Sequence, residues 1–233
     1  METANEKLIK LAAELLPVYT EQLDTLWQYS QLQEKATGDL EKITPGFDRT
    51  EFNELDELNE IASLTTISLS DILIIATGLT GAKTTWEKIY FTKQGYLTLY
   101  ETVKSYRNSN QKKLESLIKN GYSDLFPEFA AIREQLNDLA ARYRFEPDIR
   151  LMRNTIAGHV EKFKDYYRMA STLDGELLGQ ALTEFIPILH ALQLLLYRVI
   201  KRSNERIAHR WREVENKMKQ ITALLDTYTK VSR

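Results

Sequence analysis

The peptide RNTIAGH, residues 153–159, carries the residue types best suited to chemistry in this chain. Arginine holds a phosphate through a rigid fork of donors, and histidine moves protons near neutral pH. With the amide of Asn154 between them, Arg153 and His159 form a set that could cleave RNA without a metal ion. Arg150, one helical turn before Arg153, is a candidate phosphate contact.

A purely structural interpretation of the same peptide stays open. Arg153 could pair with a carboxylate such as Glu87 or Glu101, the Asn154 amide could bridge two helices, and His159 could be a hydrogen-bonded core histidine. Exposure separates the two interpretations. Catalytic side chains must line an open basic cleft, whereas structural ones are buried and fully bonded.

Two stretches of opposite charge lie within a chain whose formal net charge is only −2. Residues 39–60 are strongly acidic and residues 198–219 strongly basic. A basic helix can be an electrostatic footprint for nucleic acid, which makes Arg202 and Arg206 candidate RNA-binding residues. Basic helices are more often solvated faces. Arg202 and His209 also approximate the spacing of Arg153 and His159, but they lack the asparagine and the proline-started helix.

The elements that position these residues are predicted to be helices throughout, since Leu, Glu, Lys, Gln and Ala are abundant. The expected fold is an all-α multi-helix bundle with long antiparallel helices and a C-terminal heptad-patterned helix. Three regions are expected: residues 1–62 with a helix over 3–35, an acidic connection and a short helix after Asp48; a helical core over residues 63–200; and a basic C-terminal helix over residues 201–233.

Within the core, a single helix is predicted over residues 82–119, where Trp86, Tyr90 and Leu97 keep helical spacing. Helices are also expected from Pro127 to about residue 145, from Pro147 through the RNTIAGH peptide, and after Asp174, which should cap the last helix. Glu87 and Glu101 lie too far apart along the helix to form an acid–base pair, so both are expected to pair with arginines.

A second pattern, from Asp71 to Thr85, resembles a strand leading into a phosphate-binding loop. Such a loop needs lysine directly after its last glycine, and here Ala82 separates Gly81 from Lys83. The favoured interpretation is a buried helix, a glycine-containing turn and the start of the next helix.

Composition excludes several classes of site. The absence of cysteine rules out disulfides, thiolate zinc sites and a cysteine nucleophile. Three isolated histidines make a histidine-rich metal site improbable, and no cofactor is expected. The N-terminus is a charged amphipathic helix rather than a signal peptide, and the apolar run over residues 185–200 is shorter than a membrane span. A cytoplasmic protein without a membrane partner is expected.

A heptad seam follows the basic stretch: its apolar positions are Ile207, Trp211, Val214, Met218, Ile221, Leu225 and Tyr228. Alternating steps of four and three residues require a partner helix, either within the chain or from a second copy.

The Arg153-Asn154-x4-His159 pattern, on a late helix of an all-helical chain, resembles the signature of the HEPN superfamily. The resemblance covers about residues 64–200. It implies a helical, usually dimeric protein that is either a metal-independent endoribonuclease of toxin–antitoxin or phage-defence systems or an inactive RNA-binding or assembly module. Expected partners are a second copy, an RNA substrate and a neutralising or regulatory protein.

The spacing of the motif bears on the expected dimer. Arg153 and His159 differ by about 120° around a straight helix, so one helix alone makes a poor site. A two-fold dimer that brings both copies' motifs into one cleft would answer this objection.

Overall fold

A computed structural model describes residues 3–43, 49–145 and 163–231. Its α-helices are α1 (Ala4–Ile43), α2 (Thr50–Gly81), α3 (Thr85–Ser105), α4 (Gln111–Gly121), α5 (Phe126–Arg142), α7 (Phe163–Ser171) and α8 (Gly175–Val231). A π-helical turn, Tyr106–Asn110, joins α3 to α4, and a 3₁₀ turn, Ser123–Leu125, precedes α5. The described residues contain no strand, which confirms the all-α prediction.

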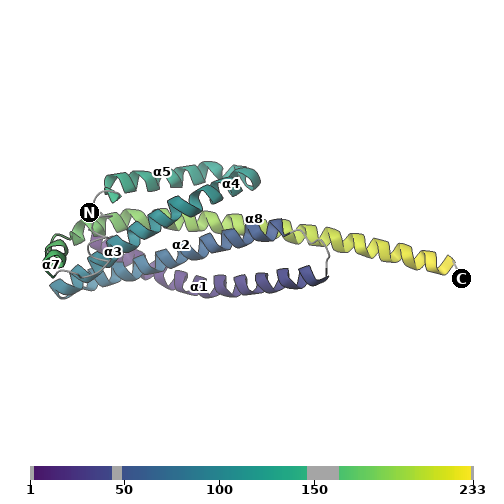
Figure 1. Cartoon of the computed structure of the whole chain (residues 1–233), viewed down its shortest axis with the longest axis horizontal. Helices are drawn as coiled ribbons and strands as arrows, with labels where there is room; N and C mark the ends of the chain where they lie inside the picture. The colour runs from purple at the N-terminus through teal and green to yellow at the C-terminus, as the bar shows by residue number, and fades with distance from the viewer. Residues whose placement is uncertain (1–2, 44–48, 146–162, 232–233) are drawn as a thin grey trace.

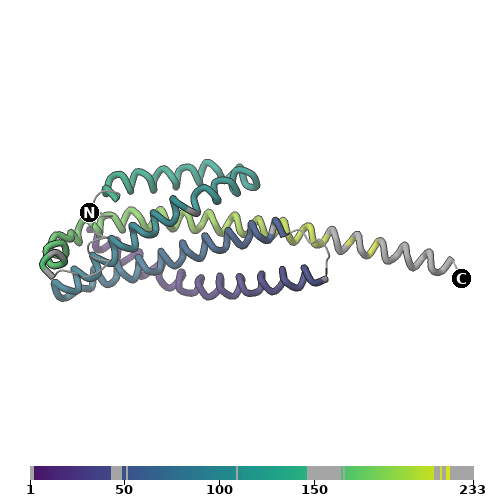
Figure 2. Tube along the Cα trace, in the orientation of Figure 1, coloured from purple at the N-terminus to yellow at the C-terminus, as the bar shows by residue number. Residues whose placement is uncertain are grey.

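The long helices lie side by side in one bundle (Figure 1). Helix α2 packs against α1, α3 and α8 and runs antiparallel to α1 and α8. Helix α5 covers α8 on another side. The Cα trace in Figure 2 places α7 and the start of α8 at one end of the bundle, and the C-terminal end of α1 toward the other. The hydrophobic core draws residues from α1, α2, α3, α4, α5 and α8.

Helix α2 is much longer than the short helix predicted there, with 32 residues. The hydroxyls of Thr65 and Thr66 donate to the carbonyls of Ile61 and Ala62, one turn earlier. These bonds satisfy two buried polar side chains inside the helix and let it continue through a threonine- and serine-rich stretch. The predicted divisions at residues 62/63 and 200/201 fall inside α2 and α8.

The single helix predicted over residues 82–119 is interrupted. The π-helical turn over residues 106–110 separates α3 from α4, and α4 ends at Gly121 as the Asn-Gly pair indicated. The turn contains arginine, serine and two asparagines, and asparagine and serine are poor formers of helix interiors because their side chains compete for backbone groups. Helix α5 ends at Arg142, slightly earlier than predicted.

The helix starts follow local signals. Asp174 accepts hydrogen bonds from the backbone N–H groups of Glu176 and Leu177, which confirms it as the cap of α8. The residues from Asp71 to Gly81 belong to α2 rather than to a strand, so the phosphate-loop interpretation is excluded there.

Gly95 lies where α3 closely approaches α2 and α8. A Cβ atom at this position would lie 2.4 Å from a Leu178 methyl of α8 and 3.3 Å from an Ile75 methyl of α2. Because Leu178 is fully buried, it has little room to move. Glycine is therefore required for the three helices to meet.

A buried polar pair ties α8 to α2. Gln193 donates from Nε2 to Thr66 Oγ1 at 2.8 Å, and both side chains are fully buried. We expect Thr66→Val to lower the free energy of unfolding by about 1–3 kcal/mol, because it leaves the buried amide of Gln193 unpaired. The measurement is urea unfolding.

The matched control is Thr77→Val, the same change at an exposed site of α2, which should cost less than about 0.5 kcal/mol. The double variant Thr66→Val/Gln193→Leu should recover most of the loss, since it removes both partners. Equal losses in the single and double variants would contradict this account.

Two helical stretches, Phe52–Gly81 and Gly175–Arg212, are long and apolar enough to cross a membrane on length and composition alone. About half of each apolar window is buried in the bundle, at 56% and 50%. Core helices of soluble bundles meet the same criterion, so this finding does not assign a membrane location.

The first two positions of the heptad seam pack within the chain. Ile207 is 8% exposed, and Trp211 lies against the hydrophobic core. The side chains of Val214, Met218, Ile221, Leu225 and Tyr228 lie outside the described residues, although the helix itself continues to Val231.

Candidate functional site

The principal predicted site residues, Arg150, Arg153, Asn154 and His159, lie outside the described residues. The chain enters this segment after Phe145, which is buried beyond the end of α5, and leaves it at α7. Arg142 and Tyr143, at the end of α5, both hydrogen bond to Glu184 of α8. The last turn of α5 is thereby attached to the α8 half of the bundle.

The other two histidines have separate surroundings. His190, on α8, shares a hydrogen bond through Nδ1 with the hydroxyl of Tyr19, which is itself only 2% exposed. Burial raises the pKa of the Tyr19 phenol above its usual range. His190 therefore joins α8 to α1. His209 is exposed further along α8.

The two arginines predicted to bind RNA on α8 are held by carboxylates. Arg202 donates from Nη1 to both carboxylate oxygens of Asp124, at 2.9 and 2.7 Å. The hydrogen bond from Arg202 holds the pKa of Asp124 below its usual value. Arg206 pairs with Glu54 at 3.1 Å and lies over the ring of Tyr122. Each guanidinium therefore pairs with a carboxylate of the chain, whereas the sequence predicted that it binds an RNA phosphate.

Glu87, one of the two glutamates predicted to pair with arginines, has a different role. Glu87 closes a capping box at the start of α3, where its Oε2 accepts from the backbone N–H groups of Thr84 and Lys83 at 2.7 Å. These bonds, first that from Thr84, lower the pKa of Glu87. Glu87, three residues after Thr84, therefore serves to cap α3 and not to pair with an arginine. Glu101 lines a groove described below.

Exposed aromatic rings gather where α3 meets α7. Trp86 and Tyr90, one turn apart on α3, are each 53% exposed, and Tyr167 of α7 is 49% exposed. Trp86 and Tyr167 meet edge to face, with ring centroids 5.9 Å apart. The Lys93 ammonium lies 5.8 Å from the ring centroids of both Tyr90 and Tyr166. These five residues define the α3–α7 surface.

Further cations lie on α3 and α7 or directly before α3. Lys83, Lys88, Lys164 and Arg168 are exposed, and within the described part of the chain none of them forms an ion pair. Residues 83–93 and 163–171 together hold five cations against two carboxylates, Glu87 and Asp165. The cap of α3 already uses the Glu87 carboxylate. The α3–α7 surface is therefore both aromatic and basic.

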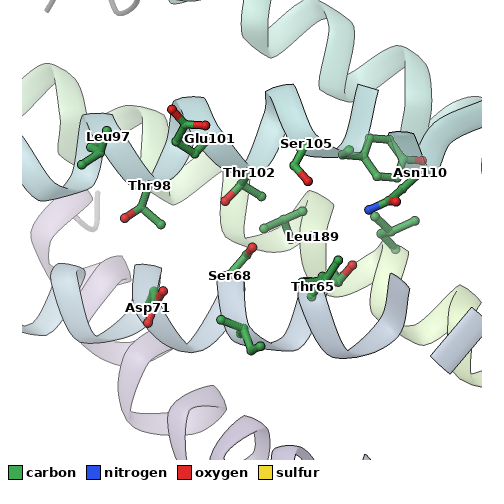
Figure 3. Close-up of a pocket in the computed structure, with 14 residues that line it drawn as sticks. Thr65, Ser68, Asp71, Leu97, Thr98, Glu101, Thr102, Ser105, Asn110 and Leu189 are labelled. Atoms are coloured by element: carbon green, nitrogen blue, oxygen red, sulfur yellow. The ribbon is translucent and has the colours of Figure 1, made fainter. Parts of the chain in front are cut away.

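A groove of about 280 Å³ lies between α2 and α3, bordered by the π-helical turn (Figure 3). Its lining combines leucine and isoleucine side chains with the hydroxyl groups of Thr65, Ser68, Thr98, Thr102 and Ser105. Asp71 and Glu101 contribute carboxylates, and partial burial raises the pKa of Asp71. Such groups accept hydrogen bonds from ammonium or guanidinium ions. No histidine lines the groove within the described residues.

The comparisons with known proteins add no assignment. No protein-family model, no curated protein and no solved structure matches the chain. In the described ranges, no group of three or more His, Asp or Glu residues is arranged to hold a metal ion.

The residues of the α3–α7 surface were not among the binding residues predicted from the sequence. The spacing of Trp86 and Tyr90 indicated one helix face, and apolar residues on such a face are usually buried. The usable signal was lysine at positions 83, 88 and 93, interleaved with the aromatic residues. Aromatic and basic residues alternating on one helix are typical of surfaces that bind single-stranded nucleic acid.

Proposed function

We propose that this protein is a metal-independent endoribonuclease of HEPN type, acting in a bacterial toxin–antitoxin or phage-defence system, with a composite site at a dimer interface. The observation that carries the proposal is the Arg153-Asn154-x4-His159 sequence between α5 and α7 of an all-α bundle. All-α architecture is what the resemblance to that superfamily implies.

The surroundings of the other candidate residues support the choice of this segment. His190 is hydrogen bonded to Tyr19, and Arg202, which approximates the same spacing with His209, is paired with Asp124. An arginine whose Nη1 already donates to both oxygens of a carboxylate is less suited to a phosphate.

Each residue of the motif has a chemical role in the proposal. His159 takes the proton of a ribose 2′-OH, or gives one to the departing 5′-oxygen. The 2′-oxygen bonds to phosphorus as the bond from phosphorus to the 5′-oxygen breaks. Arg153 stabilises the charge that builds on the phosphate, Asn154 positions the substrate, and Arg150 holds a neighbouring phosphate. The products are a 2′,3′-cyclic phosphate and a 5′-hydroxyl.

The test is incubation of the full chain with mixed single-stranded RNA and with tRNA in EDTA. We expect cleavage that leaves 2′,3′-cyclic phosphate ends and that is lost in Arg153→Ala. Products with 5′-phosphate ends, or a requirement for divalent cations, would contradict the proposed chemistry. Unchanged cleavage by the variant would show that the activity belongs to another site or to a contaminant.

The second candidate is a catalytically inactive HEPN-like module that binds RNA or assembles with a partner. The exposed rings and exposed cations of the α3–α7 surface favour it, because tryptophan, tyrosine and lysine can bind RNA but do not transfer protons near neutral pH. RNA binding by well-folded protein without cleavage would select this candidate.

A further inference from the structure

We infer that the α3–α7 surface is a binding site for single-stranded RNA, on which bases stack against Trp86 and Tyr90 while the surrounding lysines and Arg168 contact the backbone phosphates. This inference deepens the proposed function, and it rests on that proposal for the identity of the polymer. It moves the expected RNA contact away from Arg202 and Arg206 to the end of the bundle where α7 and the start of α8 lie (Figure 1).

The cations on α8 and those at the α3–α7 surface differ in their ion pairs. On α8, Arg198, Arg202 and Arg206 pair with Glu128, Asp124 and Glu54. These pairs engage three of the eight cations of residues 198–219. At the α3–α7 surface, Lys83, Lys88, Lys164 and Arg168 are exposed. Exposed cations that bind a phosphate backbone release its counterions.

The aromatic rings of the α3–α7 surface are exposed to solvent. A tryptophan and two tyrosines about half exposed at one site leave a large apolar area in water. Every base has a π face, so aromatic rings beside cations accept single strands of any sequence. Trp86 and Tyr90 lie one turn apart on a regular helix whose start is fixed by the Thr84–Glu87 capping box. The two rings are therefore held on a rigid support.

The α3–α7 surface lies close in sequence to the motif from Arg153 to His159. Helix α7 follows the segment that contains Arg153 and His159, and Tyr166 and Tyr167 lie within eight residues of His159 in sequence. A strand held on this surface is tethered next to the end of the segment that carries the proposed chemistry. Lys93 joins the two helices electrostatically, since its ammonium lies near the rings of both Tyr90 and Tyr166.

A single strand that cannot be cleaved isolates binding from catalysis. The probe is a fluorescein-labelled 2′-O-methyl oligouridine of about 12 nucleotides, within the site sizes of single-strand binders. Its ribose has no free 2′-hydroxyl to attack the phosphate. Anisotropy titration of the full chain in EDTA should give saturable binding. Trp86→Ala/Tyr90→Ala should weaken it about tenfold or more, whereas Trp27→Ala, at the 65% exposed tryptophan of α1, should not.

A second variant removes charge without removing a ring. Lys164→Glu/Arg168→Glu should weaken binding and reduce the slope of log affinity against log salt by about one or more. The matched control is Lys35→Glu/Lys112→Glu, two exposed lysines on α1 and α4. Circular dichroism and the unfolding midpoint establish that each variant is folded.

The outcomes separate this inference from the proposed nuclease. Cleavage lost in Arg153→Ala, together with unchanged binding by both surface variants, would overturn the inference and leave the nuclease proposal standing. Binding that depends on Trp86 and Tyr90 without any cleavage would support the inference and select the RNA-binding module. No binding of the probe by the natural protein would overturn the inference whatever the cleavage result.

Discussion

His159→Ala is expected to slow RNA cleavage by about 10²–10⁴-fold, the usual contribution of a positioned general acid or base. Alanine cannot take the 2′-hydroxyl proton or protonate the departing oxygen, whereas Arg153 and the α3–α7 surface remain. Initial rates on a labelled single strand in EDTA provide the measurement.

His209→Ala is the matched control, because His209 is exposed on α8 and lies outside the motif. It should cleave at the natural rate. A comparable loss in both variants would contradict the assignment of His159.

His159→Ala combined with Arg153→Ala tests whether two copies build the site. Arg153→Ala and His159→Ala are each expected to be inactive, but a mixture can form heterodimers. If each site takes its arginine from one copy and its histidine from the other, one site of each heterodimer is intact. Random mixing would restore about a quarter of the natural activity. No restoration in a mixture shown to exchange subunits would place both groups in one copy.

Leu195→Ala should lower the free energy of unfolding by about 2–5 kcal/mol. Leu195 is fully buried on α8, the helix that packs against α1, α2, α3 and α5. Its truncation leaves a cavity among several helices that cannot all close at once. A loss of this size is a large part of the about 5–15 kcal/mol that usually holds a domain folded. Urea unfolding followed by circular dichroism measures it.

The adjacent residue supplies a matched control. Leu194, on the same helix, is 49% exposed, so Leu194→Ala should change the free energy of unfolding by less than about 0.5 kcal/mol. Similar losses at the two positions would mean that the Leu194 side of α8 is also covered, by a second copy or by another partner. Protein concentration would then shift the unfolding midpoint.

Local signals in the sequence were sufficient for the fold class and for several helix starts. Asp174 hydrogen bonds to N–H groups two and three residues ahead, so the cap of α8 depends on no distant contact. Pro127 fits the first turn of α5 for a similar reason, since proline needs no hydrogen-bond acceptor there. The interruption by Ala82 was likewise enough to exclude a phosphate loop between α2 and α3.

Features that depend on tertiary contacts could not be predicted in this way. Arg202 and Asp124 are 78 residues apart, and only the packing of α5 on α8 brings their charged groups together. The spacing of Trp86 and Tyr90 shows that they share one face of α3, but it does not show whether another element packs on that face. Whether that face is core or surface depends on where α7 lies. The motif from Arg153 to His159 remains a prediction from sequence.

The length of α8 determines how the molecule moves through solvent. A helix of 57 residues is roughly 86 Å long at about 1.5 Å per residue, whereas a compact sphere of 233 residues would be about 45 Å across. Friction on such a shape exceeds that on a sphere of 27.1 kDa. A monomer should therefore elute early in gel filtration, at a Stokes radius that imitates a dimer. Sedimentation equilibrium or light scattering, which report mass, should be used to count subunits.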